Sequence, residues 1–334
     1  MENKLYLPAE WEHQEFVQLV FPHEETDWSD YLDDAITTFV NIANAIAKYE
    51  KCLIVAKNLT YVKSLFPKKR NMTFIKLDSN DTWSRDFGGI TVNNNDELTV
   101  LDFRFNAWGK KFAYNLDDQI TKKLKLKGVL KKYKHQTVPL VLEGGAIESN
   151  GEGIILTTSR CLMEKNRNPM LTQRGVEKKL VSYLGAKKIL WLNHGYLEGD
   201  DTDSHIDTLA RFVNSDTIVY QSCDDKTDVH YEELQKMKKE LSSFKNFNGK
   251  SFNLVALPWI EAQYDEEDRL PATYANFLII NGAVLVPTYD DKNDSVALQI
   301  FKKLFPKREI IAIDCQTLIR QHGSLHCVTM QYPA

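Results

Sequence analysis

Hydrophobic positions along the chain switch repeatedly between helical and extended spacing. Residues 30–49 carry Leu32, Ile36, Phe39 and Ala43 on one face, which predicts an amphipathic helix. The apolar run at 51–55 that follows is short enough to be a buried strand. The same spacing predicts further helices at 59–66, 115–127, 171–184, 228–244 and 293–305. Further strands are predicted at 72–77, 187–192, 216–221, 252–257, 277–286 and 309–314.

Two stretches have the pattern of β-hairpins. In residues 89–104, a polar NNNDE turn separates GITV from LTVLDFRF, and in residues 146–158 the turn is marked by Asn150 and Gly151. A grouping of strand, hairpin and helix returns four or five times, at irregular spacing and with no Pro-, Gly- or Ser-rich linker. We therefore predict a single α/β domain over residues 1–334, built from repeated modules. Periodicity alone does not distinguish an open parallel sheet from a closed ring of modules.

Composition narrows the class of protein. The chain has 334 residues, of which 43% are hydrophobic and 26% charged, as in soluble globular proteins. The net charge is only -4, and acidic stretches balance the Lys-rich run at 122–134, so no nucleic-acid partner is predicted. No run of eighteen apolar residues predicts a membrane span. The first residues lack a signal-peptide pattern, so we expect a cytoplasmic protein.

The cysteines offer one candidate for chemistry. There are five, dispersed and without a CxxC pair, which favours a reducing compartment over a disulfide framework. Four are interpreted as small buried residues: Cys52, Cys161, Cys223 and Cys315. Cys327 differs because it follows His326 and a glycine-containing turn. A nucleophilic cysteine needs a lowered thiol pKa, which nearby cations or backbone N–H groups supply.

His205 and Asp207 form an H-x-D pair. If this stretch is extended, alternate side chains share one face, so both would point into one site. A histidine gives and takes a proton near neutral pH, and the aspartate would orient it or bind a cation. A zinc site is an alternative, but no other His/Cys grouping has a strong metal-ligand signature, so no metal is predicted.

Two further carboxylates stand in unusual contexts. Asp86 lies in a W-x-R-D string with Trp83, and its plain alternative is a surface ion pair with Arg85. Glu143 precedes two glycines after the apolar run VPLVL, which places a carboxylate at a strand end where backbone approaches closely, or in a simple turn.

These segments, taken together and in order, resemble the agmatine deiminase family of guanidino-group-modifying enzymes. The resemblance covers nearly the whole chain, and its order makes it specific where each short motif alone is weak. The segments that carry it are Leu7–Glu12, Phe21–His23, Trp83–Asp86, Phe105–Gly109, Leu142–Ile147, Gly153–Thr158, Asn166–Pro169, Thr202–Asp207, Tyr274–Phe277, Asn281–Gly282, Val286–Pro287 and His326–Thr329.

The resemblance implies a fold and a set of roles. The fold would be a pseudo-fivefold α/β propeller, or pentein, of ββαβ modules around a central site. Cys327 would attack the guanidinium carbon of agmatine while Asp86 and Asp207 clamp its nitrogens. His205 would protonate the departing ammonia and then activate water against the amidino-thioether intermediate, and Glu143 would hold and polarise His205.

The resemblance also implies the surroundings of the reaction. Trp83 would wall the slot, and Trp108 is a further substrate-binding candidate. No metal or organic cofactor is expected, the products would be N-carbamoylputrescine and ammonia in putrescine biosynthesis, and the chain would form a dimer or higher homo-oligomer. Three positions depart from the family pattern: Gln321 and His322 replace glycines before the nucleophile segment, and Ser204 replaces a glycine before the histidine.

Three alternatives stay open. Arginine or peptidyl-arginine deimination normally requires a pocket arginine for the substrate carboxylate, and Arg104 is the only one close to residues 105–109. A non-catalytic guanidine- or polyamine-binding protein would need the carboxylates and walls but not Cys327, His205 and Glu143. A general cysteine amidase would need an oxyanion hole instead of paired carboxylates.

Overall fold

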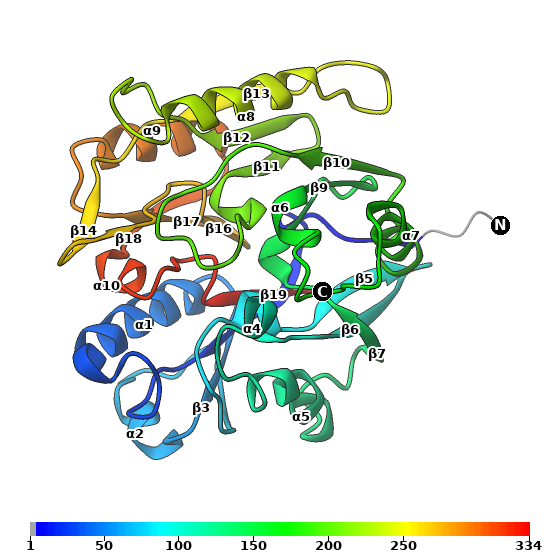
Figure 1. Ribbon diagram of the computed structural model, residues 1–334. Coiled ribbons are helices and arrows are strands. Elements are labelled where there is room, and N and C mark those ends of the chain that lie inside the picture. The colour runs from blue at the N-terminus through cyan, green and yellow to red at the C-terminus, as the bar shows by residue number, and fades with distance from the viewer. Residues whose placement is uncertain (1–4) are drawn as a thin grey trace.

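The computed structural model describes residues 5–334 and contains short and long helices interleaved with strands (Figure 1). The α-helices are α1 Leu32–Ala47, α2 Leu59–Ser64, α3 Ser84–Phe87, α4 Ala107–Lys110, α5 Ile120–Leu126, α6 Ser159–Leu162, α7 Gln173–Leu184, α8 Tyr231–Ser243, α9 Asp294–Leu304 and α10 Gln316–Ile319. The 3-10 helices are η1 Ser29–Tyr31, η2 Asp117–Gln119, η3 Gly144–Ala146 and η4 Ile206–Thr208.

The strands are mostly short. They are β1 Leu5–Tyr6, β2 Gln14–Val20, β3 Lys51–Ala56, β4 Met72–Lys76, β5 Ile90–Asn94, β6 Glu97–Arg104, β7 Lys134–Val141, β8 Ile147–Ser149, β9 Ile154–Thr158, β10 Lys188–Leu192, β11 Ala210–Asn214, β12 Thr217–Gln221, β13 Asn253–Leu257, β14 Gln263–Asp265, β15 Asp268–Leu270, β16 Leu278–Ile280, β17 Ala283–Thr288, β18 Glu309–Asp314 and β19 Thr329–Pro333.

The strands form separate small sheets that repeat one connection. Five of the sheets among residues 5–334 have three or four strands, in the orders β1-β5-β6-β7, β10-β9-β8, β11-β12-β13, β16-β17-β18 and β19-β2-β3-β4. In each, an antiparallel pair is extended by a parallel strand, for example β9 by β10 and β12 by β13. Parallel neighbours need a crossover, and one of α1, α5, α7, α8 and α9 supplies it in each sheet. These helices lie around the periphery in Figure 1, with β19 near the middle of the view.

Helix α1 shows how the sequence pattern becomes packing. Its buried side chains include Ile36, Phe39 and Ile46, which belong to the main hydrophobic cluster together with β3. The predicted helix at 30–49 and strand at 51–55 are therefore confirmed. Both predicted hairpins are also confirmed, as β5–β6 and β8–β9. Among residues 5–334, no helix has the length and apolarity needed to cross a membrane.

One strand prediction is wrong. The expected single strand at 277–286 is an antiparallel hairpin of β16 and β17, because Gly282 adopts a φ of 82° and reverses the chain. Strands β2, β11 and β19 were not predicted. In β2 the polar Gln14 and Gln18 are as buried as their apolar neighbours, so the sequence shows no alternation from which to recognise a strand.

Candidate active site

Cys327 lies in the loop between α10 and β19 and is 4% exposed. Its Sγ lies 3.4 Å from Asn276 Oδ1, which also accepts from the Cys327 backbone N–H at 3.3 Å. The Arg85 N–H donates to the Cys327 carbonyl at 3.0 Å. Because the contacts come from distant parts of the chain, the thiol sits on a loop held on two sides.

Asp86 lies on the short helix α3 and is buried. Its Oδ2 accepts from Trp108 Nε1 at 2.9 Å and its Oδ1 from the Gly145 N–H at 3.1 Å. The alternative of a surface ion pair between Asp86 and Arg85 is contradicted, since both are buried and Arg85 instead donates to the His326 carbonyl at 3.4 Å.

Three predicted site residues surround the backbone of Gly145. A Cβ atom at this position would lie 2.6 Å from His205 Nδ1, 2.9 Å from Asp86 Oδ1 and 3.1 Å from Asp207 Oδ2. The glycine is therefore required by close approach of polar side chains. The extended conformation considered for the H-x-D stretch is wrong. Residues 206–208 form the 3-10 helix η4, and this turn brings His205 and Asp207 to the same place.

The charges of this cluster depend on one another. Burial raises the pKa of Asp86 to about 6, with Asp207 and Glu143 adding to the effect and His205 opposing it. Burial acts to lower the pKa of His205, but Asp86, Cys161 and Glu143 outweigh it and raise that pKa to about 10. His205 Nδ1 and Asp86 Oδ1 are 3.6 Å apart. The pair therefore favours an imidazolium next to a carboxylate near neutral pH.

Glu143 lies directly beyond β7 but is bonded to a residue that the sequence analysis did not single out. Its Oε1 accepts from Arg167 Nε at 2.8 Å, and Arg167 also donates to Asp203 Oδ2 at 2.6 Å. Glu143 Oε2 and both ring nitrogens of His205 have no hydrogen-bond partner among the described residues. Glu143 therefore lies close to His205, as expected, but does not form a hydrogen bond with it in this structure.

Cys161 lies next to Glu143 and His205. Donor atoms of Cys161, Glu143 and His205 all lie within 4.8 Å of one another. These are donor types that zinc accepts, but the Arg167 guanidinium already occupies one oxygen of Glu143 and places a positive charge against any cation there. Cys161 is buried in the main hydrophobic cluster, as interpreted from the sequence, and it also lies beside His205.

The carboxylate of Asp207 is held in place by His326. Its Oδ2 lies 2.7 Å from His326 Nδ1, and its Oδ1 has no hydrogen-bond partner among residues 5–334. Burial acts to raise the pKa of Asp207, but the bond and charge of His326 outweigh it, so this pKa is lowered. Asp207 is therefore a carboxylate with one free oxygen.

A cavity of about 160 Å³ leads to the cluster. Of the predicted residues it is lined by Trp83, Asp86, Trp108 and Cys327, whereas Glu143, His205 and Asp207 are fully buried next to Asp86 and do not line it. The rest of its wall consists of Asp27, Asp81, Phe112, Asp201, Thr202, Gln321, His322 and Gly323. Within the described chain, no Lys or Arg side chain lines this cavity.

The tryptophans are fixed by carboxylates. Trp83 Nε1 donates to Asp81 Oδ2 at 2.9 Å, and the other oxygen of Asp81 accepts from Trp28 Nε1 at 3.0 Å. Trp108 is held by Asp86 in the same way. Both indoles that line the cavity with Cys327 are therefore held in place by a carboxylate.

The thiol itself is not activated by this arrangement alone. Burial, with the charges of Asp207 and Asp86, raises the pKa of Cys327 well above its usual value. A cation that neutralises the two carboxylates removes their part of this effect. The geometry accordingly favours thiolate formation in the presence of a positively charged ligand.

The sequence of residues 6–333 matches the family model described as Porphyromonas-type peptidyl-arginine deiminase. The chain belongs to this family. An agmatine deiminase of Medicago truncatula is 31% identical over 98% of this chain and 96% of its own length. The family resemblance predicted from the motifs is thereby confirmed.

Solved structures agree with this membership of the deiminase family. A C. jejuni agmatine deiminase with substrate bound is 41% identical, has a TM-score of 0.94, and the match covers 99% of this chain and 97% of that one. The agmatine deiminase of Enterococcus faecalis gives 28% identity and a TM-score of 0.91, with 98% and 96% covered. DDAH from Pseudomonas aeruginosa, at 12% identity and a TM-score of 0.53 over 96% and 100%, shares the mixed α/β fold.

Proposed function

We propose that this deiminase hydrolyses agmatine to N-carbamoylputrescine and ammonia, as a step of putrescine biosynthesis. The observation that carries the proposal is that Cys327 and Asp86 line one cavity in a chain of this family, while His205 and Asp207 are buried beside Asp86 around Gly145.

The two carboxylates suit a guanidinium group. A planar guanidinium offers paired N–H donors on its edges, which carboxylate oxygens accept. In the proposed complex one edge of the guanidinium faces Asp86, which lines the cavity, and the other edge donates to Asp207 Oδ1, an acceptor without a hydrogen-bond partner among residues 5–334. The bound cation also offsets the negative charges that raise the pKa of Cys327, so substrate binding promotes formation of its own nucleophile.

The covalent step then balances as follows. The Cys327 thiolate forms a C–S bond to the guanidinium carbon, and the C–N bond to one terminal nitrogen breaks as His205 delivers its proton to that nitrogen, which leaves as ammonia. Neutral His205 next takes a proton from water, whose oxygen bonds to the same carbon. The C–S bond breaks, the thiolate leaves, and the proton that remains on the former water oxygen passes to solvent, so that a neutral ureido group remains.

The cavity wall favours a substrate with a positive far end. Asp27 and Asp201 line it, and neither carboxylate forms an ion pair with another described residue. Agmatine ends in an ammonium group, which these side chains attract, whereas arginine carries a carboxylate there that finds no Lys or Arg side chain among the described residues that line the cavity. This contrast favours agmatine over arginine or peptidyl-arginine.

Two of the departures from the family pattern, Gln321 and His322, lie at the same wall. His322 lines the cavity with a φ of 63°, and its Nδ1 lies 2.8 Å from the Gly199 carbonyl oxygen. Gln321 donates to the backbone of Asp27 at 2.9 Å. We propose that these two side chains narrow the entrance relative to glycine.

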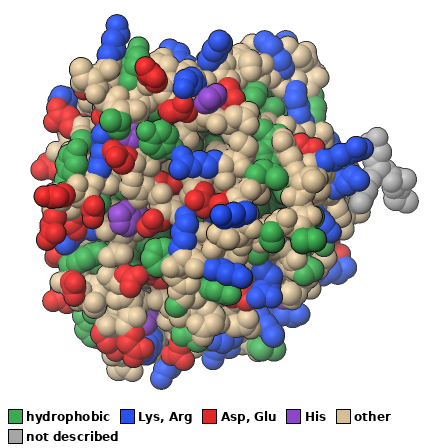
Figure 2. Space-filling model, viewed as in Figure 1, with side chains coloured by type: hydrophobic (Ala, Val, Ile, Leu, Met, Phe, Trp, Pro, Cys, Tyr) green, Lys and Arg blue, Asp and Glu red, His purple; other side chains and the backbone are tan. Residues whose placement is uncertain are grey.

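Other expectations remain proposals. The five sheets that repeat an antiparallel pair, a helix and a parallel strand support a pseudo-fivefold propeller of ββαβ modules in one domain over 1–334. Basic and acidic side chains are interspersed on the face shown in Figure 2, which supports the absence of a nucleic-acid partner. We also propose that the chain forms a homo-oligomer of two or more copies and is located in the cytoplasm. The proposed reaction uses no metal or organic cofactor.

Three separate incubations test the function. Purified protein is given agmatine, arginine or a peptide with C-terminal arginine, and ammonia and the ureido product are measured in each. Turnover of agmatine at least tenfold above the other two is expected. Greater turnover of either arginine substrate overturns the assignment of substrate, and binding of agmatine without any product supports a non-catalytic binding protein.

A further inference from the structure

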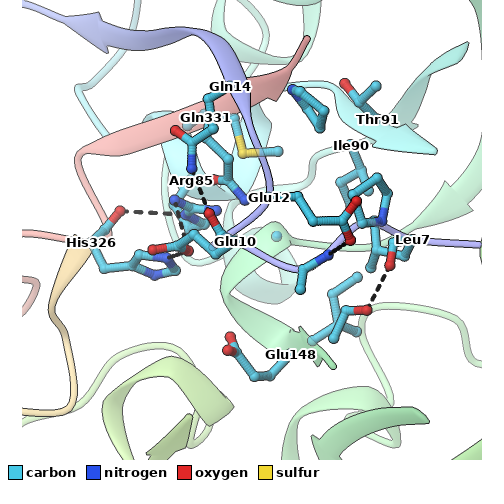
Figure 3. A pocket seen from close by; sticks show the side chains of 17 residues that line it. Leu7, Glu10, Glu12, Gln14, Arg85, Ile90, Thr91, Glu148, His326 and Gln331 are labelled. Atoms are coloured by element: carbon cyan, nitrogen blue, oxygen red, sulfur yellow. Dashed lines mark hydrogen bonds and ion pairs between the residues drawn. The ribbon is translucent and has the colours of Figure 1, made fainter. Parts of the chain in front are cut away.

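His326 joins the proposed clamp to a second buried carboxylate on its far side. Its Nδ1 lies 2.7 Å from Asp207 Oδ2, and its Nε2 lies 2.7 Å from Glu10 Oε2. The ring is 2% exposed. Figure 3 shows the histidine next to Glu10 at the edge of a second cavity, lined by Arg85 and Gln14 among others. The imidazole is therefore a bridge between two acids.

Glu10 is itself fixed in place. Its Oε2 accepts from Arg211 Nη2 at 2.7 Å, and its Oε1 accepts from the Ile279 N–H at 2.7 Å. Arg211 is fully buried and donates from Nε to Glu148 Oε2 at 3.1 Å. Each link from Arg211 through Glu10 to His326 is a charge-assisted contact with little freedom to move.

The backbone of His326 is equally constrained. Its N–H donates to Asn276 Oδ1 at 2.8 Å, and the same amide donates from Nδ2 to the Asp207 carbonyl at 3.3 Å. The ring thus meets Asp207 at one fixed orientation. Since the ring engages Oδ2 of Asp207, Oδ1 is the oxygen left without a hydrogen-bond partner within the described part of the chain.

We propose that His326 is a positioning residue for guanidinium binding: its Nδ1–H holds Asp207 so that Oδ1 is presented to the substrate, while Glu10 holds the opposite nitrogen. The proposal rests on the proposed function. It assigns His326 no contact with substrate and no proton transfer in the reaction. Loss of the Nδ1 bond should weaken substrate binding because Asp207 then rotates freely or bonds elsewhere.

Two substitutions separate the two ring contacts. In His326→Asn, the side-chain amide reaches the place of Nδ1 and keeps a donor for Asp207. In His326→Gln, the amide reaches toward the place of Nε2 and Glu10 but leaves Asp207 without its donor. Both are made together with Cys327→Ser, which permits agmatine binding to be measured by calorimetry without turnover.

We expect the Gln variant to bind agmatine at least tenfold more weakly than Cys327→Ser alone, and the Asn variant to bind within about threefold of it, since only the Asn variant keeps the hydrogen bond to the charged Asp207. With Cys327 intact, His326→Gln should raise KM more than it lowers kcat. Equal affinity of the Gln variant overturns the proposal, as does equal loss in both variants.

His230 provides a matched control. It is also buried, with Nδ1 2.6 Å from Asp228 Oδ1 and Nε2 accepting from the Glu198 N–H at 2.7 Å. His230→Gln should lower the Tm by an amount similar to His326→Gln and leave the Kd for agmatine unchanged. An equal loss of affinity in this control would mean that general destabilisation, and not Asp207, explains the result.

A measurement on the protein without a histidine substitution covers the case in which the variants fail to fold. Nitrogen-15 spectra of histidine-labelled Cys327→Ser should show a proton on Nδ1 of His326 whose signal shifts as agmatine saturates. A bare Nδ1, or a signal unmoved at saturation, overturns the proposal. If Cys327→Ser binds no agmatine at all, the proposed function fails and the inference about His326 falls with it for that separate reason.

Discussion

Trp108 donates a 2.9 Å hydrogen bond from Nε1 to Asp86 Oδ2 while its own backbone lies in the left-handed region, with a φ of 52°. Non-glycine residues in that region cost roughly 1–2 kcal/mol, so the surrounding structure holds this indole against a local preference. The neighbouring Ala107 and Lys110 also have positive φ values, and Asn106 accepts from the Gly109 N–H at 3.0 Å. The whole turn serves to aim one indole at one carboxylate.

Trp108→Phe tests this relationship. The variant keeps an aromatic wall and loses only the donor, so kcat/KM for agmatine should fall about tenfold, as expected for one hydrogen bond to a charged group. The bond helps to lower the pKa of Asp86, so the acid limb of the pH profile should also move to higher pH. An unchanged acid limb would contradict the importance of the bond. Trp191→Phe, which loses a bond to Glu177 outside the cavity, should leave both unchanged.

The pH profile follows from two raised pKa values. Asp86 has to be ionised to accept from the substrate, so kcat/KM should fall as the pH drops below about 6. His205 has to carry a proton for the leaving nitrogen, so the rate should fall as the pH rises above about 10. Steady-state kinetics from pH 5 to pH 11 measure both limbs. A profile flat through this range would contradict both assignments.

Asp86→Asn removes the charge of the clamp. It should raise KM for agmatine at least a hundredfold, because the guanidinium then faces a neutral amide in a buried place. Asp102 is a suitable comparison, since burial raises its pKa to about 6 as well but it lies outside the cavity. Asp102→Asn should leave KM within twofold, and near-normal kinetics of Asp86→Asn would mean that the clamp is misassigned.

Cys327→Ser should abolish ammonia release from agmatine while the protein stays folded, because a serine hydroxyl is far harder to deprotonate than a thiol and Asn276 Oδ1, which lies next to the Cys327 Sγ, is not a base. An ammonia assay measures the loss of turnover, and circular dichroism shows whether the variant stays folded. Cys223→Ser is the control: that thiol is also buried, in the second hydrophobic cluster, and should keep full turnover. Retained activity of the Cys327 variant would reject it as nucleophile.

Gly145→Ala probes the close approach of the three polar side chains. The added methyl group would lie 2.6 Å from His205 Nδ1, so turnover should drop at least a hundredfold and the free energy of unfolding by roughly 1–3 kcal/mol. Gly175→Ala, in helix α7 with no atom nearer than 3.4 Å to the new Cβ, should be neutral or stabilising. Equal behaviour of the two variants would show that crowding at Gly145 is unimportant.

Local signals in the sequence were sufficient for elements that bury a regular pattern. The apolar stripe that includes Phe39 predicts α1, and Asn150 with Gly151 predicts the β8–β9 turn. Strand β19 could not be predicted in this way. It pairs with β2 across about three hundred residues, Thr329 opposite Leu19, and nothing local records that partnership. The same limit hides a site assembled from separate loops.

The candidate site shows this limit residue by residue. Cys327 and the two proposed clamp aspartates stand in segments that resemble the deiminase family. In the structure Cys327 and Asp86 line one cavity, and Asp86 and Asp207 lie beside Gly145. Asn276 and Arg167 also stand in such segments, but a lone amide or guanidinium has no sequence signature of its own role. Cys161 gave no signal at all, because burial beside His205 is a property of tertiary packing.

The pairing of β19 with β2 also bears on how activity is acquired. The loop that carries Cys327 leads directly into β19, so the sulfur reaches its place only when the two distant strands have met. Contacts of such large sequence separation form slowly, since a long loop has to close first. During refolding from denaturant, helix content should therefore recover before ammonia production does, and enzymatic turnover becomes a reporter of the completed chain closure.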